Sequence, residues 1–105
     1  MSAVAIRNEY YSIAEYLALE EQALERHEYH DGWIRAMSGG TINHGLLCSN
    51  AVSTLYNANR TKGNKCTALG SEVKVRIAKD NSFVYPDAML ICGNIETAEE
   101  DPNAV

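Results

Sequence analysis

Apolar and polar residues follow helical spacing in the first clearly patterned part of the chain. From Ile13 to Leu24, apolar residues recur every three or four positions, opposite a set of acidic residues. Ser12 and Glu15 stand in the order of a capping box, in which each of these two side chains accepts a backbone N–H at the helix start. The pattern predicts an amphipathic helix from Ile13 to about Arg26.

Two short strands and a second helix are predicted next. Asp31 and Gly32 separate two short stretches, and this pair suits a type I′ turn, whose two central residues both have positive φ. We therefore expect a hairpin with strands at about 26–30 and 33–38. After a glycine-containing break, apolar residues return at three-to-four spacing over residues 41–60 and predict the second helix.

The last patterned region is a second pair of strands. Apolar and β-branched residues are frequent in 66–78 and 82–93, which are joined by a polar turn at 79–81. The predicted order is α, ββ, α, ββ, an α+β arrangement within the broad α/β class. Residues 96–105 are acidic, contain a proline and show no period, so we expect a loop or disordered tail after a domain of residues 1–95.

Composition limits the classes of protein that fit. A chain of 105 residues suits one domain with a small core, and its 46% hydrophobic and 22% charged residues are ordinary for a globular protein. No apolar run approaches the roughly 20 residues of a membrane-spanning helix. The N-terminal residues lack the basic and apolar regions of a secretory signal. We expect a cytoplasmic protein without a membrane partner.

The three cysteines are Cys48, Cys66 and Cys92, and they form neither a C-x-x-C pair nor a cluster with zinc-finger spacing. We expect free and mostly buried thiols. A single catalytic cysteine is the alternative, although no activating base adjoins any of the three in the sequence.

Charge is distributed unevenly along the chain. The net charge is −5, but residues 32–95 contain seven basic and three acidic residues, whereas residues 1–31 and 96–105 contain eleven acidic and two basic ones. A basic middle segment can contact the phosphates of a nucleic acid, because such contacts are local. A solvated loop and hairpin surface is the other interpretation. The basic residues in question are Arg60, Lys62, Lys65, Lys74, Arg76 and Lys79.

Asp87 lies in the apolar stretch FVYPDAMLIC, residues 83–92, directly after Pro86. A carboxylate buried in its ionised form without a partner costs several kcal/mol, so this residue should titrate, accept hydrogen bonds or bind a metal. Proline cannot donate a ladder hydrogen bond, and it marks an edge, bulge or bend where the next side chain can be redirected. Backbone amides at such an irregularity are the alternative partners of Asp87.

An ordered series of short motifs resembles a known family. The series comprises Tyr16-Leu17, Glu28, Asp31-Gly32, Ala36-Met37-Ser38-Gly39, His44, Ser71 and Tyr85-Pro86-Asp87. It is similar to the N-terminal half of the Uma family of restriction endonucleases, a branch of the PD-(D/E)XK nuclease superfamily, and it covers residues 10–95. The resemblance implies a restriction-endonuclease-like mixed sheet packed by helices, with the C-terminal part of that fold missing.

The resemblance also implies a metal-dependent nuclease site. Family members are taken to cleave DNA with Mg²⁺ or Mn²⁺, ions that prefer oxygen ligands and activate water. By resemblance Asp87 is a metal ligand and catalytic residue, Glu28 is a second metal carboxylate, and His44 orients a carboxylate or contacts a phosphate. The structural alternatives are an exposed hairpin glutamate and a histidine that packs or caps the helix start. Period-two alternation places Glu28 and His30 on one face of their strand.

The chain departs from the family pattern after Asp87. The family carries a glutamate on the following strand and a lysine nearby, and no later residue here fits either role. We therefore expect an incomplete endonuclease with weak or no activity, whose unpaired strand edge favours a homodimer. The alternative function is a non-enzymatic remnant or interaction module that self-associates or binds nucleic acid through the basic middle segment. A third interpretation is an unrelated α+β binding domain.

Overall fold

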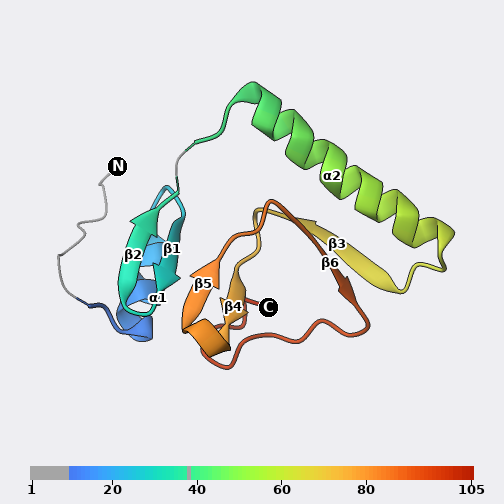
Figure 1. Cartoon of the computed structure of the whole chain (residues 1–105). Helices are drawn as coiled ribbons and strands as arrows, with labels where there is room; N and C mark the ends of the chain where they lie inside the picture. The colour runs from blue at the N-terminus through green and yellow to red at the C-terminus, as the bar shows by residue number, and fades with distance from the viewer. Residues whose placement is uncertain (1–9, 38) are drawn as a thin grey trace.

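The computed structural model describes residues 10–37 and 39–105, and Figure 1 shows its elements in the predicted order. Within that part of the chain the elements are α1 (Ile13–Gln22), β1 (His27–His30), β2 (Trp33–Ala36), α2 (Ile42–Thr61), β3 (Cys66–Gly70), β4 (Val75–Ile77), a 3₁₀ turn (Ala78–Asp80), β5 (Ser82–Val84) and β6 (Ala88–Cys92). The predicted α+β class is confirmed, and helices combined with antiparallel strands are consistent with a restriction-endonuclease-like fold.

Two predictions fall outside the described residues. The absence of a secretory signal concerns residues 1–9, and the second predicted strand was expected to include Ser38. In the part of the chain that is described, no helix is both long and apolar enough to cross a membrane.

The first helix begins as predicted and ends early. The Glu15 N–H donates to Ser12 Oγ at 3.1 Å, and the Ser12 N–H donates to Glu15 Oε1 at 2.9 Å, so the capping box is confirmed. The helix ends at Gln22 rather than near Arg26, because Ala23 already has extended backbone angles, φ −76° and ψ 144°.

The predicted hairpin belongs to a larger sheet. Asp31 and Gly32 have φ values of 47° and 101°, which confirms a turn with two positive-φ residues between β1 and β2. Among the described residues, these strands form an antiparallel sheet with the order β2-β1-β5-β4. The main core lies where α1 packs on this sheet, and its buried members are Tyr11, Tyr16, Tyr29, Phe83 and Ala104.

The second pair of strands is interrupted, which differs from the prediction. The expected strand 66–78 divides into β3 and β4, and the expected strand 82–93 divides into β5 and β6. β4 and β5 belong to the larger sheet, whereas β3 and β6 pair separately as a two-stranded antiparallel sheet. The predicted bend at Pro86 is confirmed, because this residue lies in the break between β5 and β6, where the expected strand 82–93 is interrupted.

The second helix lies along the two-stranded sheet (Figure 1). Of the α2 residues, all of which are described, only Asn59 is buried. Its amide donates to the Cys66 carbonyl and to Asn64 Oδ1, and its Oδ1 accepts the Cys66 N–H at 2.9 Å. One buried side chain therefore fixes the start of β3 against the end of α2.

The cysteine prediction is wrong for two of the three residues. Cys66 and Cys92 face each other in the β3–β6 register and form a disulfide. The sequence spacing gave no indication of this pair, because the contact depends on the register of strands separated by 26 residues. Cys48 is free, as predicted, and is half-buried.

The acidic segment 96–105 returns to the larger sheet. Ala104 is buried and forms a parallel bridge with Lys74. The Val105 N–H donates to the Lys74 carbonyl at 2.9 Å, and the Arg76 N–H donates to the Val105 carbonyl at 2.7 Å. Lys74 Nζ also pairs with the Asp101 carboxylate. The segment is therefore attached to β4 by backbone and side-chain contacts.

Candidate functional site

Asp87 lies at the interruption between β5 and β6, and its side chain is 56% exposed. The prediction of a buried carboxylate is therefore wrong. The apolar neighbours that suggested burial belong to the two strands on either side, whereas Asp87 itself follows Pro86 outside both ladders. Because solvent reaches this side chain, the cost of burying a charge does not apply to it.

His44 stands opposite Asp87 from the start of α2. Thr41 is the N-cap of this helix, and its side-chain oxygen accepts the His44 N–H at 3.1 Å. The predicted place of His44 at the opening of the second helix is confirmed. Its Nε2 atom lies 3.4 Å from Asp87 Oδ2, so two of the three predicted site residues come together.

Cys48 adds a thiol to this pair. It follows His44 by one helical turn, and its Sγ atom lies 3.3 Å from the same Nε2 atom. One ligand atom each from His44, Cys48 and Asp87 lies within 4.8 Å of the others. Burial and the neighbouring Asp87 carboxylate raise the pKa of the Cys48 thiol. We call these three residues the His–Cys–Asp cluster.

The sequence contained a weak indication of Cys48. Histidine and cysteine four positions apart lie on one face of a helix, but the carboxylate reaches them only through the packing of α2 on β3 and β6. An open pocket of about 400 Å³ adjoins the cluster and is lined by Cys48, Ser49, Val52, Ser53, Gly70, Ser71, Glu72 and Asp87.

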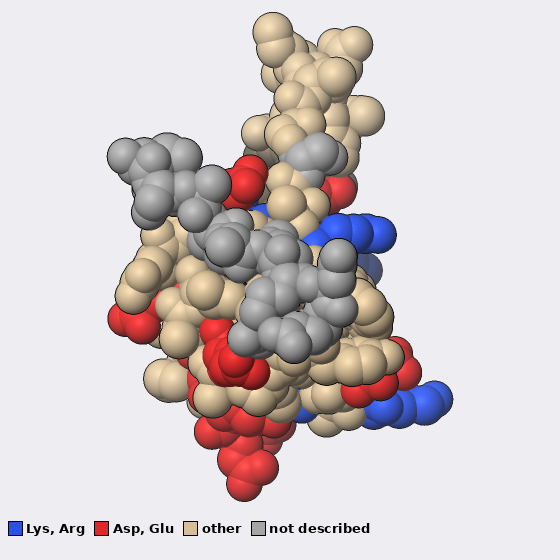
Figure 2. All heavy atoms as spheres, turned by 90° about the vertical axis from the view of Figure 1, so that its left-hand side faces the viewer, with Lys and Arg blue, Asp and Glu red and all other residues tan. Residues whose placement is uncertain are grey.

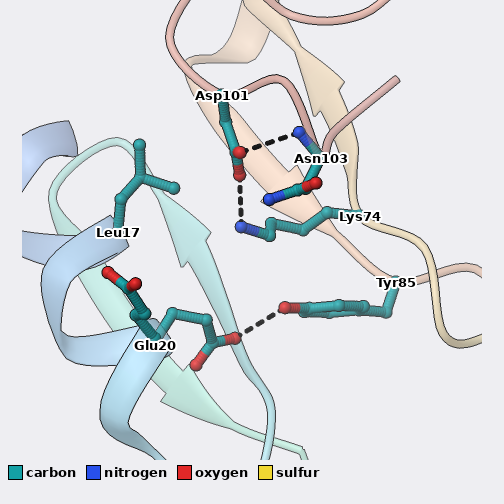
Figure 3. A pocket seen from close by; sticks show the side chains of 7 residues that line it. Leu17, Glu20, Lys74, Tyr85, Asp101 and Asn103 are labelled. Carbon is teal, nitrogen blue, oxygen red and sulfur yellow. Dashed lines mark hydrogen bonds and ion pairs between the residues drawn. The ribbon is translucent and has the colours of Figure 1, made fainter.

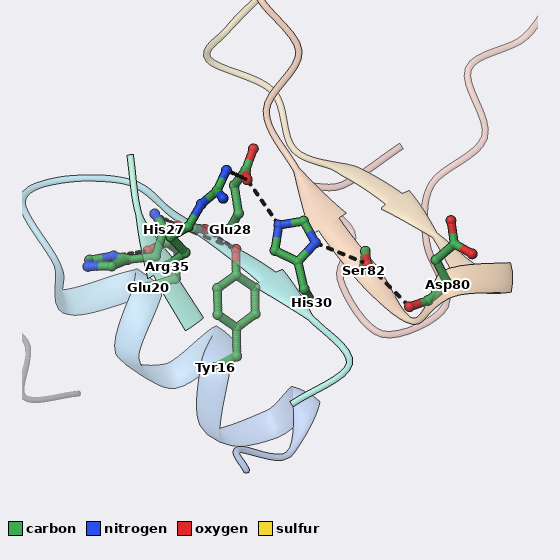
Figure 4. Close-up of polar contacts among 8 residues, drawn as sticks. All are labelled: Tyr16, Glu20, His27, Glu28, His30, Arg35, Asp80 and Ser82. Carbon is green, nitrogen blue, oxygen red and sulfur yellow. Dashed lines mark hydrogen bonds and ion pairs between the residues drawn. The ribbon is translucent and has the colours of Figure 1, made fainter. Parts of the chain in front are cut away.

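Glu28 has other partners. It lies on β1, and its Oε1 atom lies 3.0 Å from His30 Nε2 and 3.3 Å from an Arg35 nitrogen (Figure 4). The predicted shared face of Glu28 and His30 is thereby confirmed. Among the described residues, Glu28 is not a member of the His–Cys–Asp cluster. Its side chain is 17% exposed, so it is more buried than a free hairpin glutamate.

Comparison with known proteins shows the family of this chain. The model of the Uma2 family, described as "Putative restriction endonuclease", matches residues 13–105. The chain belongs to the Uma2 family. No solved structure gives a significant match to it.

Two relatives of this Uma2 chain are found among curated proteins of Synechocystis sp. The protein named "Uncharacterized protein slr1290" is 40% identical over 78 residues, which cover 74% of this chain and 40% of that protein. The protein named "Uncharacterized protein sll1609" is 32% identical over 92 residues, which cover 88% of this chain and 51% of that protein. The Uma2 chain thus spans about half the length, or less, of these relatives.

The Uma2 chain also contains a buried polar network that its sequence did not reveal. The Glu20 carboxylate contacts His27 Nδ1 at 2.9 Å and accepts the Tyr85 hydroxyl at 2.8 Å (Figures 3 and 4). The Tyr16 hydroxyl donates to the His27 carbonyl at 2.6 Å. Burial and the nearby Glu20 carboxylate raise the pKa values of Tyr16 and Tyr85 well above the ordinary range.

A cavity of about 320 Å³ borders this network in the Uma2 chain (Figure 3). It is lined by Leu17, Glu20, Glu21, Lys74, Tyr85, Asp101 and Asn103. Among its charged lining residues, Lys74 pairs with Asp101 and Glu20 pairs with His27. The network therefore joins α1 to the sheet, and the separate Lys74–Asp101 pair attaches the acidic segment.

The basic middle segment of the Uma2 chain is partly neutralised. Lys74 pairs with Asp101, and Arg76 lies 3.1 Å from a Glu100 oxygen. The hydrogen bond from Arg76 lowers the pKa of Glu100. In Figure 2 acidic side chains gather over the lower part of the molecule, while the projecting end of α2 above it is uncharged. The acidic segment thus pairs with Lys74 and Arg76, two of the basic residues that were expected to contact phosphates.

Proposed function

We propose that this Uma2 chain carries part of the active site of a divalent-metal-dependent endonuclease, with Asp87 as a metal ligand. The observation that carries the proposal is the position of Asp87, an exposed carboxylate redirected by a proline bend and facing His44 beside an open pocket. Membership of the Uma2 family supports phosphodiester hydrolysis as the reaction class. DNA is the proposed substrate.

The donor set at Asp87 fits a divalent cation. The carboxylate is open to solvent and has an imidazole at 3.4 Å, so it is available to a cation without breaking a buried hydrogen-bond network. Bound there, Mg²⁺ or Mn²⁺ would polarise a phosphodiester oxygen and lower the pKa of a water molecule. His44 would hold the Asp87 carboxylate in place or donate to a phosphate oxygen, since it lies in the first turn of α2.

Glu28 is the proposed second carboxylate of the nuclease, as the family resemblance implies. Its partner Arg35 is 77% exposed, and such exposed ion pairs contribute only about 0–1 kcal/mol. The pairing with Arg35 therefore opposes metal binding only weakly. In this proposal Asp87 is the primary ligand and Glu28 contributes when a cation and a phosphate are present.

Self-association without catalysis is the second candidate function. The surface of α2 exposes Ile42, Leu46 and Leu47, with Ile42 at 84% exposure, and large exposed apolar side chains on one element favour protein contacts. This candidate needs no metal. The comparison of wild type with Asp87→Ala described below therefore separates the two functions, because only the nuclease requires that Mn²⁺ binding and nicking depend on Asp87.

Manganese binding followed by water-proton relaxation, together with nicking of supercoiled plasmid in Mg²⁺ or Mn²⁺, tests the nuclease proposal. We expect Asp87→Ala to weaken Mn²⁺ binding about tenfold or more, which corresponds to the loss of about 1.4 kcal/mol, and to remove metal-dependent nicking. Asp80→Ala, which removes an exposed aspartate from the 3₁₀ turn, is the matched control and should leave both unchanged. Equal Mn²⁺ affinity in wild type and Asp87→Ala would overturn the assignment.

A further inference from the structure

We propose that His44, Cys48 and Asp87 form a binding site for a thiophilic divalent cation of the zinc class. This goes beyond the nuclease proposal, because it concerns which ion the cluster selects and gives Cys48 a function. The two proposals share Asp87, so a zinc-class ion and Mg²⁺ would compete for the same carboxylate.

The cluster is built from two independently anchored parts. His44 and Cys48 lie one turn apart on α2, whose first turn is capped by Thr41. Asp87 approaches from the bend after Pro86, and the packing of α2 on β3 and β6 sets its position relative to the helix. Because a helix and a proline bend hold the donors, little ordering remains to be done when an ion binds.

Two of the three donor separations match a small tetrahedral ion, and all three ligand atoms lie within 4.8 Å of one another. Zinc–nitrogen, zinc–oxygen and zinc–sulfur bonds of about 2.0–2.3 Å give donor–donor edges of about 3.4 Å for N and O and about 3.6 Å for N and S. The observed separations are 3.4 Å from His44 Nε2 to Asp87 Oδ2 and 3.3 Å from Nε2 to Cys48 Sγ. An octahedral Mg²⁺ site, with bonds of about 2.0–2.1 Å, has shorter edges of about 2.9 Å.

The chemical nature of the donors points the same way. Magnesium prefers oxygen ligands and water, whereas imidazole and thiolate together suit zinc, cobalt and related ions. Among the described residues, three histidine, cysteine or acidic side chains with converging ligand atoms are found in this cluster. Cys48 is therefore the residue that would shift the preference of the site away from Mg²⁺.

A cysteine nucleophile does not explain the same geometry. A catalytic histidine uses one ring nitrogen toward the nucleophile and the other toward the orienting carboxylate. Here both Cys48 and Asp87 contact the same ring nitrogen of His44, Nε2. The three donor atoms are therefore grouped together and do not form a chain from carboxylate through imidazole to thiol. A bound cation would also stabilise the thiolate, which the neighbouring carboxylate disfavours in its absence.

The surroundings leave room for a further ligand. The adjoining pocket is open and about 400 Å³ in volume, and three serines, Ser49, Ser53 and Ser71, line it. Three protein ligands and an open position occupied by water are the usual arrangement of an accessible zinc site.

Cobalt substitution provides a direct spectroscopic test on the whole chain. Co²⁺ added to the disulfide-bonded protein should give the visible bands of a tetrahedral ion and a near-ultraviolet band of thiolate-to-cobalt charge transfer, and Zn²⁺ should displace both. Cys48→Ser should abolish the charge-transfer band. His44→Ala should weaken Co²⁺ binding by about tenfold or more, since even losses of outer ligands weaken metal sites by about 10- to 100-fold. Thr54→Ala, which changes an exposed α2 residue outside the lining of that pocket, is the matched control and should change neither.

Two results would overturn the zinc-class site: no charge-transfer band in the wild type, or a band that survives Cys48→Ser while circular dichroism shows an intact fold. The outcomes also separate the two proposals. If Mn²⁺ binding depends on Asp87 but the cobalt band is absent, only the zinc-class site fails. If the cobalt band appears but Mn²⁺ binding and nicking ignore Asp87→Ala, only the nuclease fails.

Discussion

The two halves of the molecule differ in what holds them together. In the α1 half, formed by α1 with the β2-β1-β5-β4 sheet, aromatic side chains are packed against one another, and Tyr16 and Phe83 have their ring centroids 5.4 Å apart with no exposed surface. In the α2 half, formed by α2 with β3 and β6, large apolar side chains such as Leu46 and Leu90 stay exposed. The contacts that hold it together include the β3–β6 ladder, the Asn59 hydrogen bonds and the Cys66–Cys92 disulfide.

This contrast explains where the candidate site lies. Buried polar groups of the α1 half pair with each other, as in the contact between Glu20 and His27, whose side chains are 7% and 4% exposed. The His–Cys–Asp cluster lies instead on the α2 half, where a carboxylate and an imidazole remain open to solvent. Buried polar networks stabilise a fold, whereas exposed convergent donors are available to a ligand.

The largest expected effect is the loss of a core aromatic ring. Phe83→Ala should lower the free energy of unfolding by about 3–5 kcal/mol, because it removes a fully buried ring and leaves a cavity. The matched substitution in the α2 half, Leu46→Ala, should change it by no more than about 0.5 kcal/mol, since this side chain is 57% exposed. Urea unfolding of both variants measures the difference, and similar losses would show that the α2 half has a core of its own.

Reduction of the disulfide should come next in size. A cross-link over 26 residues is expected to contribute about 3 kcal/mol, and reduction acts on Cys66–Cys92 alone because Cys48 is already a free thiol. We expect faster amide exchange in β3 and β6, with exchange in β1 and β5 unchanged. Hydrogen exchange with and without reductant checks this. Acceleration spread evenly over both sheets would mean that the halves unfold together.

The smallest of the three effects concerns the attachment of the acidic segment. Burial alone would raise the pKa of Asp101, but hydrogen bonds from Lys74 and from the Asn103 N–H lower it overall. A carboxyl with a lowered folded pKa stabilises the protein above its unfolded pKa of about 3.9, and this contribution disappears as the pH falls through the folded value. Asp101→Asn should therefore cost about 2 kcal/mol at neutral pH.

Thermal unfolding across a pH series measures this effect. The difference between wild type and Asp101→Asn should shrink as the pH falls below about 4, because the carboxyl of the unfolded state is then protonated, and it should be lost once the pH passes the lower folded pKa. Glu96→Gln, which removes an exposed charge from the same segment, serves as the control. A difference that stays constant in acid would show that the pair with Lys74 is not its source.

Local physical chemistry accounts for the parts of the fold that the sequence predicts. The capping box at Ser12, the turn at Asp31-Gly32 and the bend at Pro86 depend on neighbouring residues or on the backbone limits of one residue, and all three are confirmed. The early end of α1 and the division of the long strands depend on tertiary packing, which overrides the local pattern.

The candidate site divides in the same way. The helix-start position of His44 was predictable from spacing, but the exposure of Asp87 and the approach of Cys48 depend on how α2 crosses the β3–β6 pair. The disulfide was missed because cysteine pairing follows strand register. The roles of Asp87, Glu28 and His44 in catalysis stay predictions that the metal titrations address.

The amide of Asn59 has a consequence for how the hairpin is specified. By accepting the N–H and donating to the carbonyl of one residue, it imitates a neighbouring strand at Cys66. The position of Cys66 against α2 is thus set by the Asn59 side chain and does not depend on the disulfide. After the disulfide is opened, the Asn59 bonds would still hold Cys66 against α2, and the β3–β6 ladder would keep Cys92 opposite it, so the same two thiols would meet again on reoxidation.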